Sequence, residues 1–475
     1  MSSQWSRDHL PPHCCGRKVH LPQCWLSYCP VVRMVGEETS LTGGKPERAL
    51  SGRWHLPERP LRILLALVAL LVAAMPLFSS TSRPLVTQPF PDAPTYADTA
   101  FLISNGVGFG TRVDERLTPE QDSASNVVRP SRYPPGFPLF LSPFVRLANN
   151  EVTDAAGGAR AAALLLLFSV FLAAFALGGP LAAAIAALVV WSSPFTRQSS
   201  AVLMSDAYGA SIALLVLACL TFAWSTVRDE RLRQFLMGVA GFLSGYALLV
   251  RITAVAMLGA LLVSARRRFV RAVALGALPC LIFLGTFQWT EFGSPLRSGY
   301  DFYLPTLRPI AAEYVLSPDL LNERGYIFED RLDGRFMPWT CPCDAGGPVG
   351  TSNNLIFYPA VLLGLVWVFA PPLFPLLGIW ELVRRRRQQS AQFAMATIAW
   401  YFVFFVPYFY QGARLMAPAA FMLLAFAAAR AAQLLESWTA IVAKRLRPAR
   451  DRISKRDPEQ LGPELQTILT QSYQT

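Results

Sequence analysis

Long runs of apolar residues, separated by short polar segments, fill most of the sequence from residue 62 onward. A helix that crosses a bilayer needs about 20 predominantly apolar residues. Candidate spans lie near 62–78, 160–178, 180–195, 201–224, 234–250, 252–264, 270–289, 355–382, 391–410 and 413–434. The pattern therefore predicts an all-α polytopic membrane protein with about ten transmembrane helices.

Glycine and proline interrupt two of these runs. Gly178, Gly179 and Pro180 divide one long apolar stretch, which predicts a helical hairpin with its turn at these residues. Three prolines, at positions 371, 372 and 375, are expected to kink or shorten the run at 355–382.

Two long segments between spans, 79–158 and 290–354, carry few apolar runs. Loops of this length are usually functional, and short helices lying on the membrane surface would suit both. We therefore expect one membrane domain over 59–435, with both segments as outer loops. Within the first loop, Gly106 to Gly110 (GVGFG) lacks the Lys and the Ser or Thr of a phosphate loop, so it is interpreted as a flexible connection.

The two ends of the chain differ from the membrane domain. Residues 1–58 are expected to be a disordered cytoplasmic tail, or an upstream stretch from a mis-assigned start with Met34 as the real beginning. This segment holds all four His and four of the eight Cys, but their spacing fits no regular zinc finger. Residues 436–475 are expected to be a basic cytoplasmic tail.

Composition and charge support the membrane assignment. The chain is 53% hydrophobic and 16% charged, a balance that a water-soluble globule could not bury. Its net charge of +12 does not indicate a nucleic-acid partner, because the basic residues gather in short runs between apolar stretches. Those runs are Arg228, Arg231 and Arg233; Arg266, Arg267, Arg268 and Arg271; Arg384 to Arg387; and Lys444, Arg445, Arg447 and Arg450.

The position of these basic runs predicts the orientation, because short loops rich in Lys and Arg stay on the cytoplasmic side. With ten spans, every basic run falls on the same face as the N-terminus. Loops 79–158 and 290–354 then lie on the opposite face. Ala-, Leu- and Arg-rich usage favours a bacterium, so we expect the cytoplasmic (inner) membrane, with the active site facing the outside.

The few charged residues near the spans lie at their outer ends. A charge at mid-bilayer costs roughly 2.5–3.5 kcal/mol on insertion scales, so its placement is informative. Asp206 begins the fourth span, Arg251 lies between the fifth and sixth, and Arg414 lies between the ninth and tenth. Each alone could be an interfacial anchor that extends its charge to water. Together they favour a site for an anionic group at the membrane surface.

The first outer loop offers further polar groups. Asp92 and Tyr96 lie in PDAPTYADTA, and a helix that begins near Pro94 would place Tyr96 one turn beyond Asp92. Arg132 and Tyr133 stand just before a Pro pair, which favours an extended, rigid approach. An ordinary solvated loop could show the same spacing. The membrane domain has no His, which excludes a His-dependent zinc hydrolase or a serine triad there.

These motifs resemble the GT-C superfamily of membrane glycosyltransferases, which includes protein mannosyltransferases and lipid A aminoarabinose transferases. Its D-x-x-x-Y-A-[DE] element is matched by Asp92, Tyr96, Ala97 and Asp98. Arg132-Tyr133-Pro134-Pro135 is similar to its basic-Pro-Pro element, in which the basic residue often directly precedes the prolines. Four later segments also resemble family elements: LMSDAYGASIALLVL, GFLSGYALLVRITAVAMLGALL, FGSPLRSGY and YQGARLMAP. The resemblance covers roughly residues 60–430.

The resemblance implies transfer of a sugar from a polyprenyl-phosphate donor to an envelope acceptor, which is a lipid, a polysaccharide or a protein. Asp92 is the expected general base, and Tyr96, Asp98 and Asp206 are expected to orient the acceptor or base. The donor phosphate is expected to bind Arg132, Tyr133, Arg251, Tyr300 and Arg414.

No cofactor is required in this scheme, although a divalent cation held by Asp92 and Asp98 is an alternative, since some relatives use one. The second functional class is a lipid or sugar transporter. Transporters place ionisable groups near the midplane and often carry inverted repeats, and this sequence shows neither feature.

Overall fold

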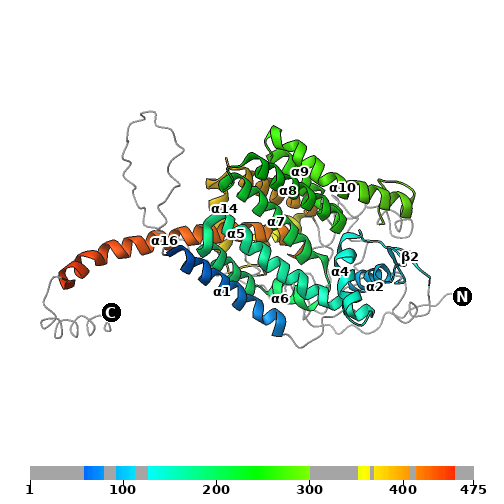
Figure 1. Cartoon of the computed structure of the whole chain (residues 1–475), viewed down its shortest axis with the longest axis horizontal. Helices are drawn as coiled ribbons and strands as arrows, with labels where there is room; N and C mark the ends of the chain where they lie inside the picture. The colour runs from blue at the N-terminus through cyan, green and yellow to red at the C-terminus, as the bar shows by residue number, and fades with distance from the viewer. Residues whose placement is uncertain are drawn as a thin grey trace, which may run out of the picture. The chain divides into compact units, whose positions relative to one another are not determined.

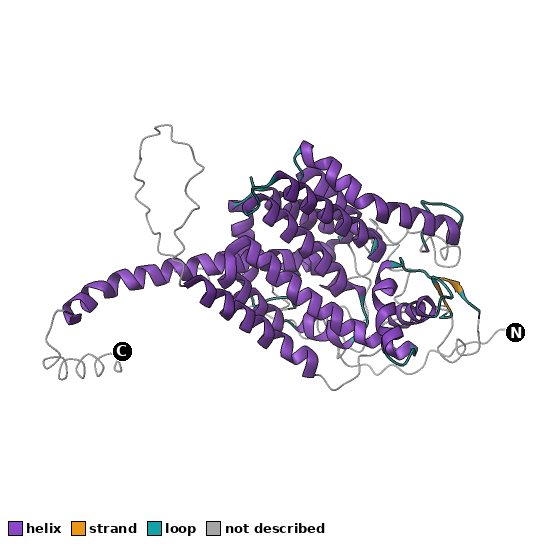
Figure 2. Ribbon diagram, in the orientation of Figure 1, coloured by secondary structure: helices purple, strands orange, loops and turns teal. Residues whose placement is uncertain are grey.

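The computed structural model describes residues 58–79, 92–113, 127–299, 351–363, 368–406 and 413–454. The predicted N-terminal tail up to residue 57, Tyr300 and most of the second outer loop (300–350) lie outside these residues. Helices dominate the described chain (Figure 2). One pair of two-residue strands accompanies them, β1 (Gly110–Thr111) and β2 (Arg129–Pro130), and it pairs antiparallel.

The helices follow the order of the predicted spans and add short elements in the first outer loop (Figure 1). They are α1 (Glu58–Ser79), α2 (Asp92–Ser104), α4 (Gly136–Leu147), α5 (Ala156–Ser192), α6 (Pro194–Ala201), α7 (Ser205–Ser225), α8 (Glu230–Val250), α9 (Val255–Ser264), α10 (Arg267–Phe292), α13 (Thr351–Leu362), α14 (Phe374–Arg384), α15 (Gln389–Phe405) and α16 (Ala417–Ser454). Short 3-10 helices are η1 (Val152–Ala155), η2 (Ile252–Ala254) and η5 (Ala413–Met416).

Five helices in the described residues are long and apolar enough to cross a membrane: Val152–Ser192, Ser205–Ser225, Glu230–Val250, Arg267–Phe292 and Ala413–Arg445. Three shorter apolar helices, Pro60–Pro76, Gly136–Leu147 and Ile252–Ser264, accompany them. The chain is thus an integral membrane protein. The count of about ten spans is not confirmed, because α9, α13, α14 and α15 are each shorter than a full bilayer crossing.

The predicted break at Gly178-Gly179-Pro180 is confirmed inside α5, where Gly179 has a φ of 79° and a ψ of −167°. The first arm brings Phe175 against Phe222, near the end of α7. The second arm returns beside α16, so that Phe195, just beyond it, contacts Phe421, close to the start of α16. Only glycine adopts this backbone readily, and the chain therefore folds back as a hairpin.

Prolines also shorten the eighth predicted span. The segment is divided into α13 and α14, and α14 begins at Phe374 with a proline in its first turn. Leu373, directly before it, has a φ of 70°, which is uncommon for a residue with a side chain.

Small residues let α8 and α10 pack closely along their length (Figure 1). A Cβ added to Gly241 would lie 2.2 Å from the Val273 carbonyl oxygen, and one added to Gly276 would lie 2.0 Å from the Gly238 carbonyl oxygen. The glycines therefore permit backbone contact that larger residues would block. This packing supports α8, which ends directly before Arg251.

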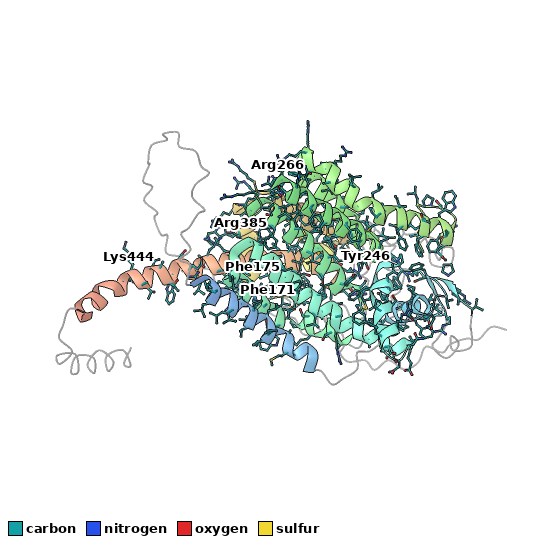
Figure 3. The ribbon with its side chains drawn as sticks, viewed as in Figure 1. Phe171, Phe175, Tyr246, Arg266, Arg385 and Lys444 are labelled. Atoms are coloured by element: carbon teal, nitrogen blue, oxygen red, sulfur yellow. The ribbon has the colours of Figure 1, made fainter. Side chains whose placement is uncertain are left out.

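The basic runs gather at one end of this bundle. Arg62 of α1 forms an ion pair with Glu436 of α16 at 3.0 Å. Arg385, directly after α14 (Figure 3), donates to the Leu177 carbonyl at 3.1 Å, near the turn of α5. Arg233 and Arg266 both lie over the ring of Trp224, near the end of α7. The same helices have Asp206, Arg251 and Arg414 at their other ends. The boundary predicted after residue 435 falls inside α16, which continues to Ser454.

Candidate active site

Asp92 is the first residue of α2, two positions before the predicted start. An acid is favourable in the first turn of a helix, and proline is tolerated there. The Asp92 carboxylate accepts a hydrogen bond of 2.6 Å from the Tyr133 hydroxyl through Oδ1. The side chain remains 17% exposed. Asp92 is therefore held from one side and open on another.

Tyr133 is held in place by its surroundings. Its ring packs against Tyr96, with centroids 4.7 Å apart, and the side chain is buried. The Pro134-Pro135 pair leads directly into α4, where a Cβ on Gly136 would lie 2.6 Å from the Leu249 backbone. The Arg132 guanidinium lies 5.8 Å from the centroid of the Tyr133 ring. The start of α4 therefore docks against the end of α8, next to Arg251.

Two arginines and two acids form a connected chain at this end of the bundle. Arg414 in η5 lies 3.8 Å from Asp92 Oδ2 and 3.6 Å from Asp206 Oδ2. Arg251 lies 2.8 Å from Asp206 Oδ1. The Asp206 side chain is only 2% exposed and lies between both guanidinium groups. We call Asp92, Asp206, Arg251 and Arg414 the site cluster.

Two residues that the sequence analysis did not single out support the site cluster. The Ser205 hydroxyl accepts a hydrogen bond of 3.1 Å from Arg251 Nε and lies 3.2 Å from the Tyr96 hydroxyl. Met204 Sδ lies 3.5 Å from Arg414 Nη1. Both residues belong to the LMSDAYG segment, in which Asp206 is the only charged residue. Tyr96 therefore connects α2 to α7 through Ser205.

The structure places Asp98 apart from Asp92. Asp98 is buried, and Oδ2 accepts hydrogen bonds from the Thr111 hydroxyl and the Arg112 backbone N–H. Its Oδ1 accepts from Nε of Arg112 at 2.9 Å and from Nη2 of the same guanidinium. Six positions along α2 correspond to a rotation of about 240°, so the two acids point to different sides of the helix. Within the described residues, Asp98 therefore bonds to Thr111 and Arg112 and not to the site cluster.

The second outer loop reaches the site through its first residues. A Cβ on Gly299 would lie 2.5 Å from the Arg132 carbonyl oxygen and 2.6 Å from that of Ser131. Glycine is therefore required for this close approach. The FGSPLRSGY segment packs against the backbone that carries Arg132 and Tyr133. Tyr300 follows immediately but lies outside the described residues.

The described residues contain no group of three His, Cys, Asp or Glu that could hold a metal ion. Asp92 and Asp98, the predicted alternative ligands, each have separate partners. The site cluster instead offers an accessible carboxylate beside two guanidinium groups. Such an arrangement can accept a proton at Asp92 and can bind an anion at Arg251 and Arg414.

Comparison with solved structures identifies the fold. ArnT from Cupriavidus metallidurans bound to undecaprenyl phosphate superposes with a TM-score of 0.50 and 17% sequence identity, over 85% of this chain and 67% of ArnT. The chain has the GT-C fold. The predicted resemblance is thereby confirmed at the level of fold.

Two further solved structures are similar to a lower degree. ArnT from the same organism in the apo state gives a TM-score of 0.48, at 17% identity over 85% of this chain and 66% of that one. The oligosaccharyltransferase AglB from Archaeoglobus fulgidus, in complex with an inhibitory peptide and a dolichol-phosphate, gives 0.45, at 15% identity over 84% and 53%. The chain thus spans about two thirds of ArnT and about half of AglB. No family model and no curated protein matches the sequence.

Proposed function

We propose that this protein is a glycosyltransferase that moves a sugar from a polyprenyl-phosphate-linked donor to an envelope acceptor. The acceptor is a lipid, a polysaccharide or a protein, and the reaction takes place at the non-cytoplasmic membrane face. The observation that carries the proposal is the site cluster, in which Asp92 lies within 3.8 Å of Arg414 and Asp206 contacts both arginines. A GT-C neighbour bound to undecaprenyl phosphate supports the class of donor.

Arg251 and Arg414 have the chemistry needed for the donor phosphate. A polyprenyl phosphate is a competent leaving group at neutral pH, so no general acid is required. Negative charge grows on the phosphate as the glycosidic bond breaks, and fixed guanidinium groups stabilise that charge more in the transition state than in the ground state. Asp206 holds both guanidiniums at a defined separation before the donor arrives.

Asp92 is the proposed general base for the acceptor hydroxyl or amine. Of the two acids in the site cluster, Asp92 is the more accessible, at 17% exposed against 2% for Asp206. The Tyr133 hydroxyl occupies Oδ1 and so orients the carboxylate, while Oδ2 faces Arg414. In-line attack by the activated acceptor, with departure of the lipid phosphate, inverts the anomeric centre.

This scheme requires no metal cofactor, because the two guanidiniums supply the positive charge on the phosphate side.

The proposed direction of the chain in the membrane is supported by the basic runs. The basic runs lie at the end of the bundle opposite the site cluster, and loops rich in Arg stay in the cytoplasm. The site is therefore assigned to the outer face of the bacterial inner membrane.

The direct test uses the purified full chain in liposomes supplied with synthetic polyprenyl-phosphate sugars and with extracted envelope lipids, glycans and proteins. Mass spectrometry should detect the sugar on one acceptor class, together with free polyprenyl phosphate. Movement of intact donor between leaflets without bond cleavage would instead support the transporter reading. Cysteine labelling that finds residues near Asp92 and Arg268 on the same face would overturn the sidedness.

A further inference from the structure

Asp98 is saturated by hydrogen bonds and has no capacity left for a substrate. An ionised carboxylate accepts about four hydrogen bonds. Asp98 receives four, three of them from the backbone and guanidinium of Arg112 and one from the hydroxyl of Thr111. Its side chain is 5% exposed, and the Arg112 guanidinium also lies over the ring of Phe101 at 5.1 Å. Asp98 therefore anchors residues 111–112 to α2.

That anchored segment leads to the site through the only strands in the described part of the chain. Thr111 pairs with Arg129, and Gly110 pairs with Pro130. A Cβ on Gly110 would lie 2.9 Å from the Arg129 carbonyl oxygen, so β1 and β2 are in close contact. Three residues after Pro130 the chain reaches Tyr133, whose backbone N–H donates to Ser131 Oγ at 3.3 Å.

The series of contacts that starts at Asp98 in α2 returns to α2 at Asp92. Asp98 holds β1, β1 pairs with β2, and β2 leads to Tyr133, which donates to Asp92 at 2.6 Å. Asp92 and Asp98 both belong to α2, so the helix contacts the same loop system at two points. We propose that Asp98 and Arg112 are positioning residues that set the Tyr133 hydroxyl against the Asp92 carboxylate. The inference rests on the proposed function for its effect on turnover.

The first test measures, without any activity assay, whether the Asp98–Arg112 pair holds β1 and β2 in place; we call this pair the clamp. Hydrogen exchange followed by mass spectrometry is compared for wild type and Asp98→Asn in lipid nanodiscs. Peptides covering 108–113 and 127–133 should exchange about 10-fold faster or more in the variant, because local opening costs less free energy once the anchor is lost. Peptides from α4 at 139–147 should not change. Unchanged exchange at 127–133 overturns the inference.

A matched control comes from the same outer loop. Asp154 accepts hydrogen bonds from the backbone N–H groups of Asn149 and Glu151 at 2.9 Å, outside the path from Asp98 through the two strands to Tyr133. Asp154→Asn should leave exchange at 127–133 unchanged. Arg112→Gln removes the guanidinium that pairs with Asp98, and the Arg112 side chain is 35% exposed. This variant is used in place of Asp98→Asn if Asp98→Asn does not fold. Faster exchange at 127–133 in Asp154→Asn would indicate general loosening and overturn the inference.

The second test is a double-mutant cycle on turnover. Asp98→Asn and Tyr133→Phe should each lower kcat by about 10-fold, with the donor KM little changed, because both misplace the base. If Asp98 acts through Tyr133, the double variant is no worse than the poorer single variant. Independent sites would multiply to about 100-fold, which would overturn the inference. A wild type inactive with every donor would overturn the proposed function, and the exchange experiment would still decide whether the clamp exists.

Discussion

The two ends of the helical bundle use ion pairs differently. In the site cluster, Asp92, Asp206, Arg251 and Arg414 come from distant parts of the chain and share partners. At the basic end, Glu381 is paired mainly with the arginines three and four positions further along the chain. The pairs there that join distant parts of the chain, Arg62–Glu436 and Arg268–Glu230, are exposed and share no buried acid.

Burial alone does not separate these two groups, since the Glu381 side chain is 0% exposed. What distinguishes the site cluster is an acid, Asp92, that accepts a hydrogen bond from a hydroxyl yet is still accessible, next to two arginines from distant parts of the chain. A local pair can stabilise its own helix end, and an exposed pair contributes little, whereas the site cluster combines a buried acid with partners from distant parts of the chain. This contrast is the reason why the proposed function gives catalytic roles to the first group and structural roles to the second.

The largest effect is expected from Asp92→Asn. Asn retains the size of Asp and can still accept from Tyr133, but it no longer accepts a proton from the acceptor. Turnover should fall by about 100-fold or more, with donor affinity little changed. Steady-state kinetics with a saturating acceptor would measure this. Near-normal turnover in this variant would remove Asp92 from the mechanism.

A smaller effect is expected from Arg251→Ala. A hydrogen bond to a charged group contributes about 1.5–3 kcal/mol, so the donor KM should rise by about 10-fold or more. Arg251→Lys keeps the charge beside the buried Asp206 and should recover part of the loss. Size-exclusion chromatography in detergent checks that both variants remain folded. An unchanged donor KM in Arg251→Ala would return this residue to the role of an interfacial anchor.

Tyr133→Phe tests the orientation of the base and keeps the ring packed against Tyr96. Loss of the 2.6 Å hydrogen bond should lower kcat by about 10-fold, less than loss of the base itself. If the donor KM rises and kcat is constant, Tyr133 binds the phosphate, as the sequence resemblance implied.

Glu381→Gln is the matched change at the basic end. Removing one partner from a buried ion pair costs about 3–5 kcal/mol in stability, so the Tm should fall. Turnover per folded molecule should stay close to wild type, because Glu381 belongs to α14 and pairs away from the site cluster. A large loss of turnover with an unchanged Tm would mean that the two ends are functionally coupled.

Chelation should have the smallest effect. Because Arg251 and Arg414 are proposed to neutralise the phosphate, incubation with EDTA should leave turnover unchanged. Addition of Mg²⁺ or Mn²⁺ after chelation serves as the control. Loss of activity that either ion restores would assign part of the charge stabilisation to a metal.

The sequence allowed much of this arrangement to be predicted, for a physical reason. Charge is costly inside a bilayer, so Asp206, Arg251 and Arg414 had to lie at helix ends, and the basic runs predicted which ends belong together. The break at Gly179 followed from local chemistry in the same way. The number of spans could not be predicted in this way, because hydropathy does not distinguish a full crossing from short helices such as α9 and α14.

The fine geometry of the site depends on contacts between distant residues, which no local sequence pattern indicates. Asp98 was predicted to orient the acceptor or base, and in the structure the helical rotation from Asp92 turns its side chain toward Arg112. Arg112 itself is a single basic residue in a loop, and no spacing rule connects it to Asp98. Tyr133 was expected at the phosphate, but its hydroxyl donates to Asp92, a partner 41 positions away.

The order of the site cluster along the chain has a consequence for biosynthesis. Asp92, Asp206 and Arg251 emerge from the ribosome well before Arg414, which directly precedes the last long helix. Chains are made from the N-terminus at about 5–20 residues per second, so the Asp92–Arg414 pair cannot form for many seconds after Asp92 is synthesised. A nascent or truncated chain without Arg414 thus holds two acids and one of the two arginines. Assembly of the complete charge set therefore coincides with synthesis of α16, and under the proposed function an unfinished chain lacks one of the two arginines that bind the donor phosphate.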